Sequence, residues 1–312
     1  MGARLRAGRR STKIARLVVE KEKPSRTSEA AAVHRAVHQL LDDEPKILVD
    51  PIALRLVESA LSAWRDAGTP KGVDLKVEAS KPVFKQLRSR LVMRSRYAED
   101  CLSDAVAQRA IQQYLILGAG LDTFAFRQPS WARSIQIFEV DHPATQRDKR
   151  ERLETAGLLA PANLHFAPVD FETMSLTDGL SACGFDFDSL TFCSWLGVSY
   201  YLTEEAIDRT LEVVHRLPRG SEIVFEYMIA LELLSREQTE QIADAEVRKK
   251  TMGINEPTLT RFTPAQLQAK LRRIGFSEAI DFSTEDAQRR YFQGRRDGLA
   301  AESAAHLMRA IV

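Results

Sequence analysis

Two short stretches decide the fold: Tyr114-Leu115-Ile116-Leu117-Gly118-Ala119-Gly120-Leu121-Asp122 and, about twenty residues further on, Glu139-Val140-Asp141. The first is an apolar run that ends in two glycines, and the second ends an apolar run with an acid. This pairing is typical of a nucleotide-type pocket at the carboxyl edge of a parallel sheet. Glycines let the backbone approach a ligand closely, and the acid can accept hydrogen bonds from both ribose hydroxyls.

The rhythm of the chain around this pair predicts an α/β fold with a seven-stranded, mostly parallel, Rossmann-like sheet. Helices of crossover length are expected between the strands, at about 142–158, 203–216 and 264–273. Strand candidates lie at 113–118, 134–140, 163–168, 189–195, 221–228 and 277–283, with a seventh near Arg289 to Gln293.

Helical patterns precede the first strand, and a long connection interrupts the second half. Residues 27–41, Asp50 to about Ala67, and Pro82 to about Ala110 read as helices, with 68–81 as a loop. Residues 27–110 are therefore interpreted as a helical cover on an α/β core at 111–312, all within one domain at 27–312. The connection at 229–262 is too long for a simple loop, and its apolar pattern favours a helical insertion over the functional edge.

Composition is that of a soluble protein and predicts a cytoplasmic location. The 312 residues are 44% hydrophobic and 28% charged, with no apolar run of the roughly 18 residues that cross a bilayer and no secretion-signal core. We therefore expect no membrane association. Three scattered cysteines, Cys101, Cys183 and Cys193, show no metal or disulfide spacing.

Charge is uneven along the chain. Residues 1–26 hold nine Lys/Arg and two Glu, whereas the remainder holds 35 basic and 41 acidic residues. We interpret 1–26 as a basic, flexible tail. The acidic body does not favour nucleic acid as a partner.

The glycine loop itself discriminates between cofactors. A dinucleotide fingerprint would place a third glycine at position 123, which is Thr123, and Asp122 would repel a diphosphate. S-adenosylmethionine carries no phosphate and has a sulfonium cation, so it suits this loop better. Asp141 would bind the ribose diol. Asp170, after the third strand, would accept from the adenine amino group, with helix capping as the alternative, and Phe171 would pack on the adenine ring.

Several motifs together resemble the leucine carboxyl methyltransferase family, and its bacterial branch in particular. The resemblance covers roughly residues 25–300 and implies a class I methyltransferase fold. It is carried by Leu117–Thr123 and Phe138-Glu139-Val140-Asp141-His142-Pro143, by Ser25-Arg26-Thr27-Ser28-Glu29, Val49-Asp50-Pro51 and Arg94-Ser95-Arg96-Tyr97, and less specifically by Arg290-Tyr291-Phe292-Gln293-Gly294-Arg295.

The resemblance implies cofactor roles residue by residue. Gly118 and Gly120 match the glycine loop, Asp141 the ribose acid, and Asp170 with Phe171 the adenine pair. Arg94 matches the arginine that meets the cofactor's carboxylate, and Arg96 takes that role in a shifted alignment. One position departs, because Leu196 stands where the family often has a Glu.

The expected reaction is O-methylation of a carboxylate on a small-molecule substrate. A carboxylate is ionised near neutral pH, so no general base is needed and an arginine would orient it. Candidate substrate contacts are Arg96, Tyr97, Tyr200, Tyr201 and Tyr227.

Other functions stay open at this point. A hydroxyl or phenol acceptor would need a base such as His142, His34 or His38, although a structural role is favoured for all three. No third ligand accompanies the two histidines of the first helix, so we predict no metal site. A nicotinamide-dependent oxidoreductase and a non-catalytic cofactor-binding protein are the remaining alternatives, and the sequence names no catalytic residue.

Overall fold

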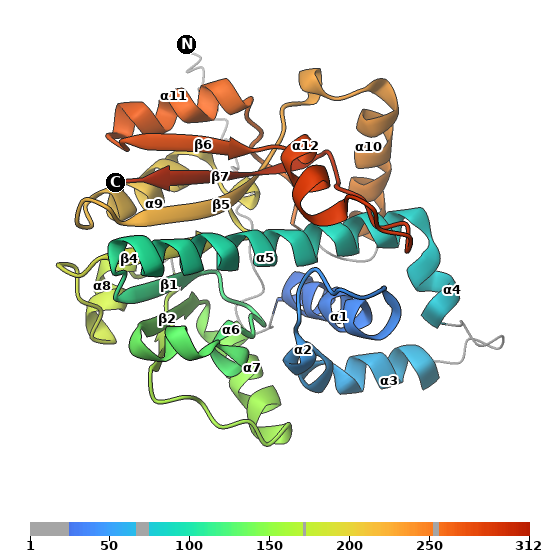
Figure 1. The fold of residues 1–312 in the computed structure, drawn as a ribbon, viewed down its shortest axis with the longest axis horizontal. Coiled ribbons are helices and arrows are strands. Elements are labelled where there is room, and N and C mark those ends of the chain that lie inside the picture. The colour runs from blue at the N-terminus through green and yellow to red at the C-terminus, as the bar shows by residue number, and fades with distance from the viewer. Residues whose placement is uncertain (1–24, 67–74, 171–172, 252–255) are drawn as a thin grey trace, which may run out of the picture.

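The computed structural model describes residues 25–66, 75–170, 173–251 and 256–312, and within them it builds one seven-stranded sheet (Figure 1). The strand order is β3-β2-β1-β4-β5-β7-β6. Strands β1 to β5 pair in parallel, whereas β7 is antiparallel to both β5 and β6. The predicted fold is thus confirmed. The strands are β1 (Gln113–Leu117), β2 (Gln136–Asp141), β3 (Leu164–Pro168), β4 (Thr191–Trp195), β5 (Glu222–Met228), β6 (Glu278–Phe282) and β7 (Ala305–Ile311).

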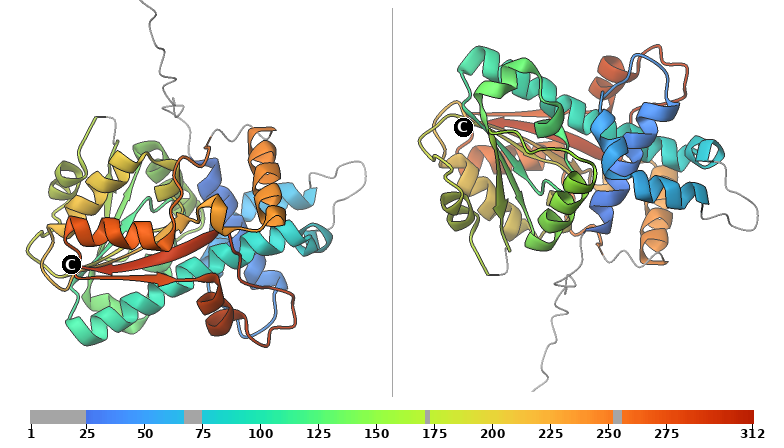
Figure 2. Two further views of the ribbon diagram at one scale, coloured as in Figure 1. Left: turned by 90° about the horizontal axis from the view of Figure 1, so that it is seen from above. Right: turned by 90° about the horizontal axis from the view of Figure 1, so that it is seen from below.

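Helices cover both faces of the sheet (Figure 2). On one face, Tyr114 and Ile116 of β1 pack with Val92 and Leu102 of α5 (Pro82–Arg109), near α6 (Phe124–Arg127). On the other, the alternate strand residues pack against α8 (Leu176–Ala182), α9 (Glu204–His215) and α11 (Pro264–Ile274). Because both faces are covered, β1, β4 and β5 are buried along their whole length.

The N-terminal helices form a layer beyond the carboxyl ends of the parallel strands (Figure 1). They are α1 (Arg26–Leu41), α2 (Pro51–Leu56), α3 (Glu58–Asp66) and α4 (Leu75–Ser80). Asp50 caps α2 by accepting from Ala53 N at 3.1 Å, and Pro51 fills the first turn as predicted. The predicted second helix is divided at Val57. The prediction of a loop at 68–81 is wrong over α4, and 67–74 lie outside the described residues, as do 1–24 of the predicted tail.

The prediction of a seventh strand near Arg289 to Gln293 is wrong. That segment continues α12 (Thr284–Ala287) as the π-helical turn η4 (Gln288–Phe292). A capping box between Ser283 and Asp286 starts this helical stretch and commits the backbone to it. The true last strand, β7, is inserted between β5 and β6 and is covered on both faces, which removes the alternation that marks a half-buried strand.

The predicted insertion is helical, with η3 (Leu231–Leu233) and α10 (Arg236–Thr251). Its return segment is fixed to the sheet edge, because Ala230 N donates to Phe262 O and Phe262 N donates to Met228 O, each at 3.0 Å. Figure 1 shows α10 on the same side as α1, beyond the carboxyl ends of the strands. The remaining long crossover helix is α7 (Pro143–Thr155). None of the helices in the described part of the chain combines the length and apolar character that a bilayer crossing requires.

Candidate active site

The glycine loop leaves β1 with its backbone in the left-handed region. Gly118 has φ +67° and Gly120 has φ +50°, a conformation that costs little only without a Cβ. A Cβ on Gly118 would lie 2.4 Å from Val198 Cγ2, and one on Gly120 would lie 2.7 Å from Ser28 Oγ. The two glycines thus let β4's following loop and helix α1 approach the end of β1 closely.

Asp141, at the end of β2, is held against this loop by main-chain donors. Its Oδ2 accepts from Gly120 N at 2.5 Å and its Oδ1 accepts from His142 N at 2.6 Å. Burial raises the pKa of the Asp141 carboxyl above its usual value, while the two N–H donors oppose this shift. Each oxygen retains a further lone pair, so the carboxylate can still accept from a ligand.

Asp170 lies in the turn after β3, where its main-chain oxygen accepts from Thr173 N at 2.9 Å and Met174 N at 2.8 Å. The alternative of a cap on the next helix is not what the structure shows, because Ser175 caps α8. Val169 N donates to Asp141 O, which places this turn beside the end of β2. Phe171 lies outside the described residues.

Arg94 reaches the same edge from α5. Its Nη1 donates to Glu226 Oε2 at 2.7 Å, and Arg90 Nε donates to Glu226 Oε1 at 2.6 Å. A Cβ on Gly197, which follows β4, would lie 2.8 Å from both terminal nitrogens of Arg94, so this arginine rests on bare backbone. Sequence reasoning missed Arg90 and Glu226. The spacing of four between Arg90 and Arg94 on a helix was the available signal.

Tyr200 and Tyr201 form the turn η2 (Ser199–Tyr201) after β4, and their rings contact each other edge to face with centroids 4.5 Å apart. Arg90 Nη2 donates to Tyr200 OH at 2.8 Å. Tyr200 O accepts from Leu259 N at 2.8 Å and from Thr260 N, which joins the insertion's return segment to this turn. The two tyrosines thus lie between the insertion and the Arg94 cluster.

The other substrate candidates have different surroundings. Tyr97 stacks on Phe282 of β6 with ring centroids 3.9 Å apart. Arg96 Nε donates to Asp100 at 2.8 Å on its own helix, and Tyr227 OH donates to Asp281 of β6 at 2.7 Å. Tyr97 and Tyr227 are therefore directed toward β6, and Arg96 is paired along its own helix; none of the three side chains is placed at the glycine loop by these contacts.

A buried network of hydrogen bonds and ion pairs holds the glycine loop in place. Arg35 Nη2 donates to Leu121 O at 2.5 Å, and Arg35 Nε donates to Asp50 Oδ2 at 2.9 Å. Arg127 Nε donates to Thr123 Oγ1 at 3.0 Å and its Nη1 donates to Glu99 at 2.9 Å. Asp50 of the Asp-Pro motif therefore positions Arg35, and Arg35 in turn binds the main chain of the glycine loop.

The histidines have structural partners. His38 Nδ1 lies 2.7 Å from Asp42 Oδ2 and its Nε2 accepts from Ile47 N at 3.1 Å. Burial lowers the pKa of His34 to about 4, so it is neutral at physiological pH. His142 caps α7 through Ala144 N. Within the described ranges, no cluster of His, Cys, Asp or Glu is arranged to hold a metal ion.

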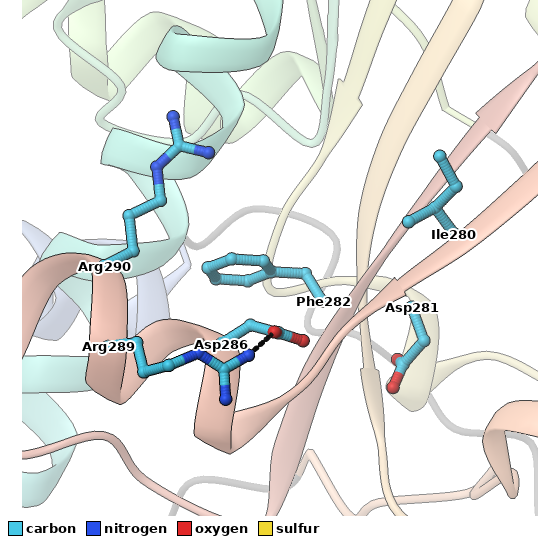
Figure 3. A pocket seen from close by; sticks show the side chains of 6 residues that line it. All are labelled: Ile280, Asp281, Phe282, Asp286, Arg289 and Arg290. Carbon is cyan, nitrogen blue, oxygen red and sulfur yellow. Dashed lines mark hydrogen bonds and ion pairs between the residues drawn. The ribbon is translucent and has the colours of Figure 1, made fainter.

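A hollow of about 420 Å³ opens elsewhere, beside β6 at the edge of the sheet. Figure 3 shows Phe282 and Arg290 beside it and Arg289 paired with Asp286. In the strand order, β4, β5 and β7 separate this hollow from the end of β1. It is therefore distinct from the edge that the glycine loop occupies.

The residues at the glycine-loop edge fit S-adenosylmethionine. The glycine loop holds the Asp141 carboxylate through Gly120 N, and that carboxylate has acceptor capacity left, as a ribose diol requires. Ser28 Oγ is buried against Gly120 and has no hydrogen-bond partner among the described residues. Two arginines and one glutamate follow along the edge, with charges suited to an amino acid group.

Comparison with known proteins agrees with this reading. The family model described as leucine carboxyl methyltransferase matches residues 28–215. YktD of Bacillus subtilis is 36% identical over 227 residues, which is 72% of this chain and 73% of YktD. Its name describes it as an inferred S-adenosyl-L-methionine-dependent methyltransferase. A Mycobacterium avium protein with the same kind of name is 30% identical over 200 residues, which is 62% of each chain.

Solved structures show the same fold. A DUF574 family protein from Streptomyces avermitilis superposes with a TM-score of 0.53 at 15% identity, covering 94% of this chain and 98% of that one. A protein from Thermobifida fusca, described as an inferred methyltransferase, superposes with a TM-score of 0.53 at 15% identity, covering 93% of this chain and 95% of that one. The family match confirms the predicted enzyme class and cofactor. The chain belongs to the leucine carboxyl methyltransferase family.

Proposed function

We propose that this protein transfers the methyl group of S-adenosylmethionine to a carboxylate oxygen of a small metabolite. When bound, the cofactor supplies an electrophilic methyl on sulfur; the C–S bond breaks as the new C–O bond forms, and no proton moves. The protein's task is then to hold the acceptor oxygen in line with that methyl group. An ionised carboxylate needs orientation and no base.

The cofactor is proposed to lie along the carboxyl edge from Asp170 to Arg94. Asp141 would hold the ribose, and Gly118 and Gly120 would allow close approach to the adenosyl group. Asp170 and Phe171 would contact the adenine, and Arg94 the cofactor's carboxylate. Tyr200 and Tyr201 would border the acceptor.

The observation that carries the choice of a carboxylate is Arg261. It lies on the insertion's return segment, half-buried, and its Nη1 donates to Ile229 O at 3.2 Å. Burial lowers the pKa of Arg261 below its usual value and the charge of Arg90 adds to this, whereas Glu246 and Glu302 oppose it. The planar, charged fork of Arg261 suits a carboxylate.

A hydroxyl acceptor is the second candidate, and Glu302 favours it. Burial raises the pKa of Glu302 above its usual value, against the attraction of Arg90. Its Oε2 is buried without a hydrogen-bond partner in the described part of the chain. A carboxylate of raised pKa could take the proton of a hydroxyl nucleophile.

The two candidates give chemically different products. Purified protein is incubated with methyl-labelled S-adenosylmethionine and a metabolite extract, and the products are treated with mild alkali. A methyl ester releases its label as volatile methanol, whereas a methyl ether keeps it. Label retained after alkali refutes the carboxylate assignment.

Arg261→Ala tests the residue that carries the choice. It should raise KM for the acid acceptor at least about tenfold, the loss of one charge-assisted pair. The matched control is Arg236→Ala, because Arg236 is an exposed arginine of α10 paired with Glu240. Equal effects of the two substitutions would contradict the role of Arg261.

A further inference from the structure

The cluster of Arg90, Arg94 and Glu226 is buried and lies toward the carboxyl end of β5. Glu226 is fully buried in β5, and both of its oxygens accept from arginines that lie one turn apart on α5. Burial acts to raise the pKa of Glu226, but the two arginines outweigh it and hold that pKa below the usual value. Glu226 is therefore a carboxylate, and the cluster carries two positive charges and one negative charge.

The sheet register places Glu226 beside Leu196. The last paired residues of β4 and β5 are Trp195 and Phe225, so positions 196 and 226 follow side by side on neighbouring strands, which lie about 4.8 Å apart. Leu196 packs into the core between the sheet and α5, and Glu226 points to arginines of α5. The side chains at the two positions thus share one face of the sheet.

The cluster is continuous with the glycine loop. Gly197 has φ +77° and lies under the Arg94 guanidinium, while the next residue, Val198, contacts the bare side of Gly118. These two consecutive residues connect the charged cluster on one side with the loop on the other. A ligand at the glycine loop that extends along this edge therefore meets Arg94 next, and Glu226 is the carboxylate with which Arg94 pairs.

We propose that Glu226 binds the ammonium group of the cofactor's amino acid end, with Arg94 and Arg90 binding its carboxylate. This rests on the proposed cofactor site. It supplies, from the neighbouring strand, the acid that Leu196 does not provide. Each Glu226 oxygen uses one lone pair on an arginine and has another for a donor. The opposite charges of the cluster match those of a zwitterion.

Two ligands separate this role from general damage to the site. S-adenosylhomocysteine carries the amino acid end, and 5′-methylthioadenosine lacks it, so their affinities are measured by calorimetry on the full chain. Glu226→Gln, which keeps shape and removes charge, should weaken S-adenosylhomocysteine about 10- to 100-fold, the range of one charge-assisted hydrogen bond. The affinity for methylthioadenosine should change by less than about twofold, which is within the ordinary error of additivity.

Glu222→Gln is the matched control. Glu222 is also a buried glutamate of β5, on the same face and paired with two arginines, Arg109 and Arg309, but it lies at the opposite end of the strand. It should leave both affinities unchanged. Adding Leu196→Glu to Glu226→Gln should restore much of the lost affinity. If Glu226→Gln does not fold, Arg90→Gln/Glu226→Gln takes its place and is compared with Arg90→Gln alone, because Arg90 is itself proposed to bind the cofactor's carboxylate.

The outcomes are distinct. An unchanged affinity for S-adenosylhomocysteine in Glu226→Gln, or an equal loss for both ligands, overturns the role of Glu226 while the cofactor site stands. A wild-type protein that binds neither ligand overturns the proposed function and this inference with it. Selective loss of S-adenosylhomocysteine, absent in Glu222→Gln, supports the inference.

Discussion

Replacing Gly118 by alanine should destabilise the protein through two separable effects. The left-handed backbone at φ +67° costs a residue with a Cβ about 1–2 kcal/mol. The new Cβ would also lie 2.4 Å from Val198 Cγ2, which forces that side chain or the loop to move, at about 1–3 kcal/mol. Gly118→Ala should therefore lower the free energy of unfolding by about 2–5 kcal/mol, the sum of these two ranges.

The second substitution, Val198→Ala, isolates the clash. It removes both Cγ atoms and leaves Val198 Cβ at 3.5 Å, an ordinary contact. Alone, it should cost about 1 kcal/mol for the lost half-buried methyl groups. The double variant should then be destabilised by only about 2–3 kcal/mol, because the backbone term remains and the overlap does not.

Urea unfolding of the four proteins closes this cycle. The expected coupling free energy is about 1–3 kcal/mol, well above the few tenths that independent sites show. If the two substitutions are additive within that error, the tight contact between the glycine loop and the β4 loop does not exist in solution.

Three further predictions concern the carboxylates Asp141, Glu139 and Asp50. Asp141→Ala should weaken S-adenosylhomocysteine at least about 100-fold, for two charge-assisted hydrogen bonds, and calorimetry showing wild-type affinity would remove the ribose assignment. Burial raises the pKa of Glu139 to about 7 despite its pairing with Lys149. A carboxyl whose pKa is raised in the folded state stabilises the protein at low pH and loses that contribution as the pH rises. From about pH 4.5 to 7, the free energy of unfolding of Glu139→Gln relative to wild type should therefore increase by about 3 kcal/mol. A difference between the two proteins that does not change with pH contradicts this. Asp50→Ala leaves Arg35 buried and unpaired and should cost about 3–5 kcal/mol in denaturant unfolding; a loss under about 1 kcal/mol would mean that the pair is not formed.

The part of the site that sequence predicts is the part whose residues are neighbours along the chain or at fixed motif intervals. Gly118, Gly120 and Asp141 belong to consecutive strand ends, and parallel topology brings such ends to one edge. Their hydrogen bond and close contacts appear in the structure. The roles of these residues remain predictions, but their juxtaposition required only the strand order.

The remainder depends on packing that no local pattern encodes. Which tyrosines lie near the edge depends on how α5 crosses the sheet: Tyr97 turns toward β6, whereas Tyr200 meets Arg90. The pairing of Arg90 with Glu226 joins residues 136 positions apart and requires both the helix face and the β4–β5 register. Likewise β7 was missed because burial on both faces erases its alternation.

The two buried glutamates of β5 show why position along a strand, and not residue type, decides what an ion cluster can do. Glu222 and Glu226 are each paired with two arginines on the same face. Removing either carboxylate leaves two arginines without their anionic partner, so the two substitutions should lower the free energy of unfolding by comparable amounts. Only Glu226 lies at the carboxyl end, where an open parallel sheet leaves space between diverging connections for a ligand. A charged cluster at that end can take up an external partner beside its internal ones, whereas the same cluster at the amino end of the strand lies away from that space.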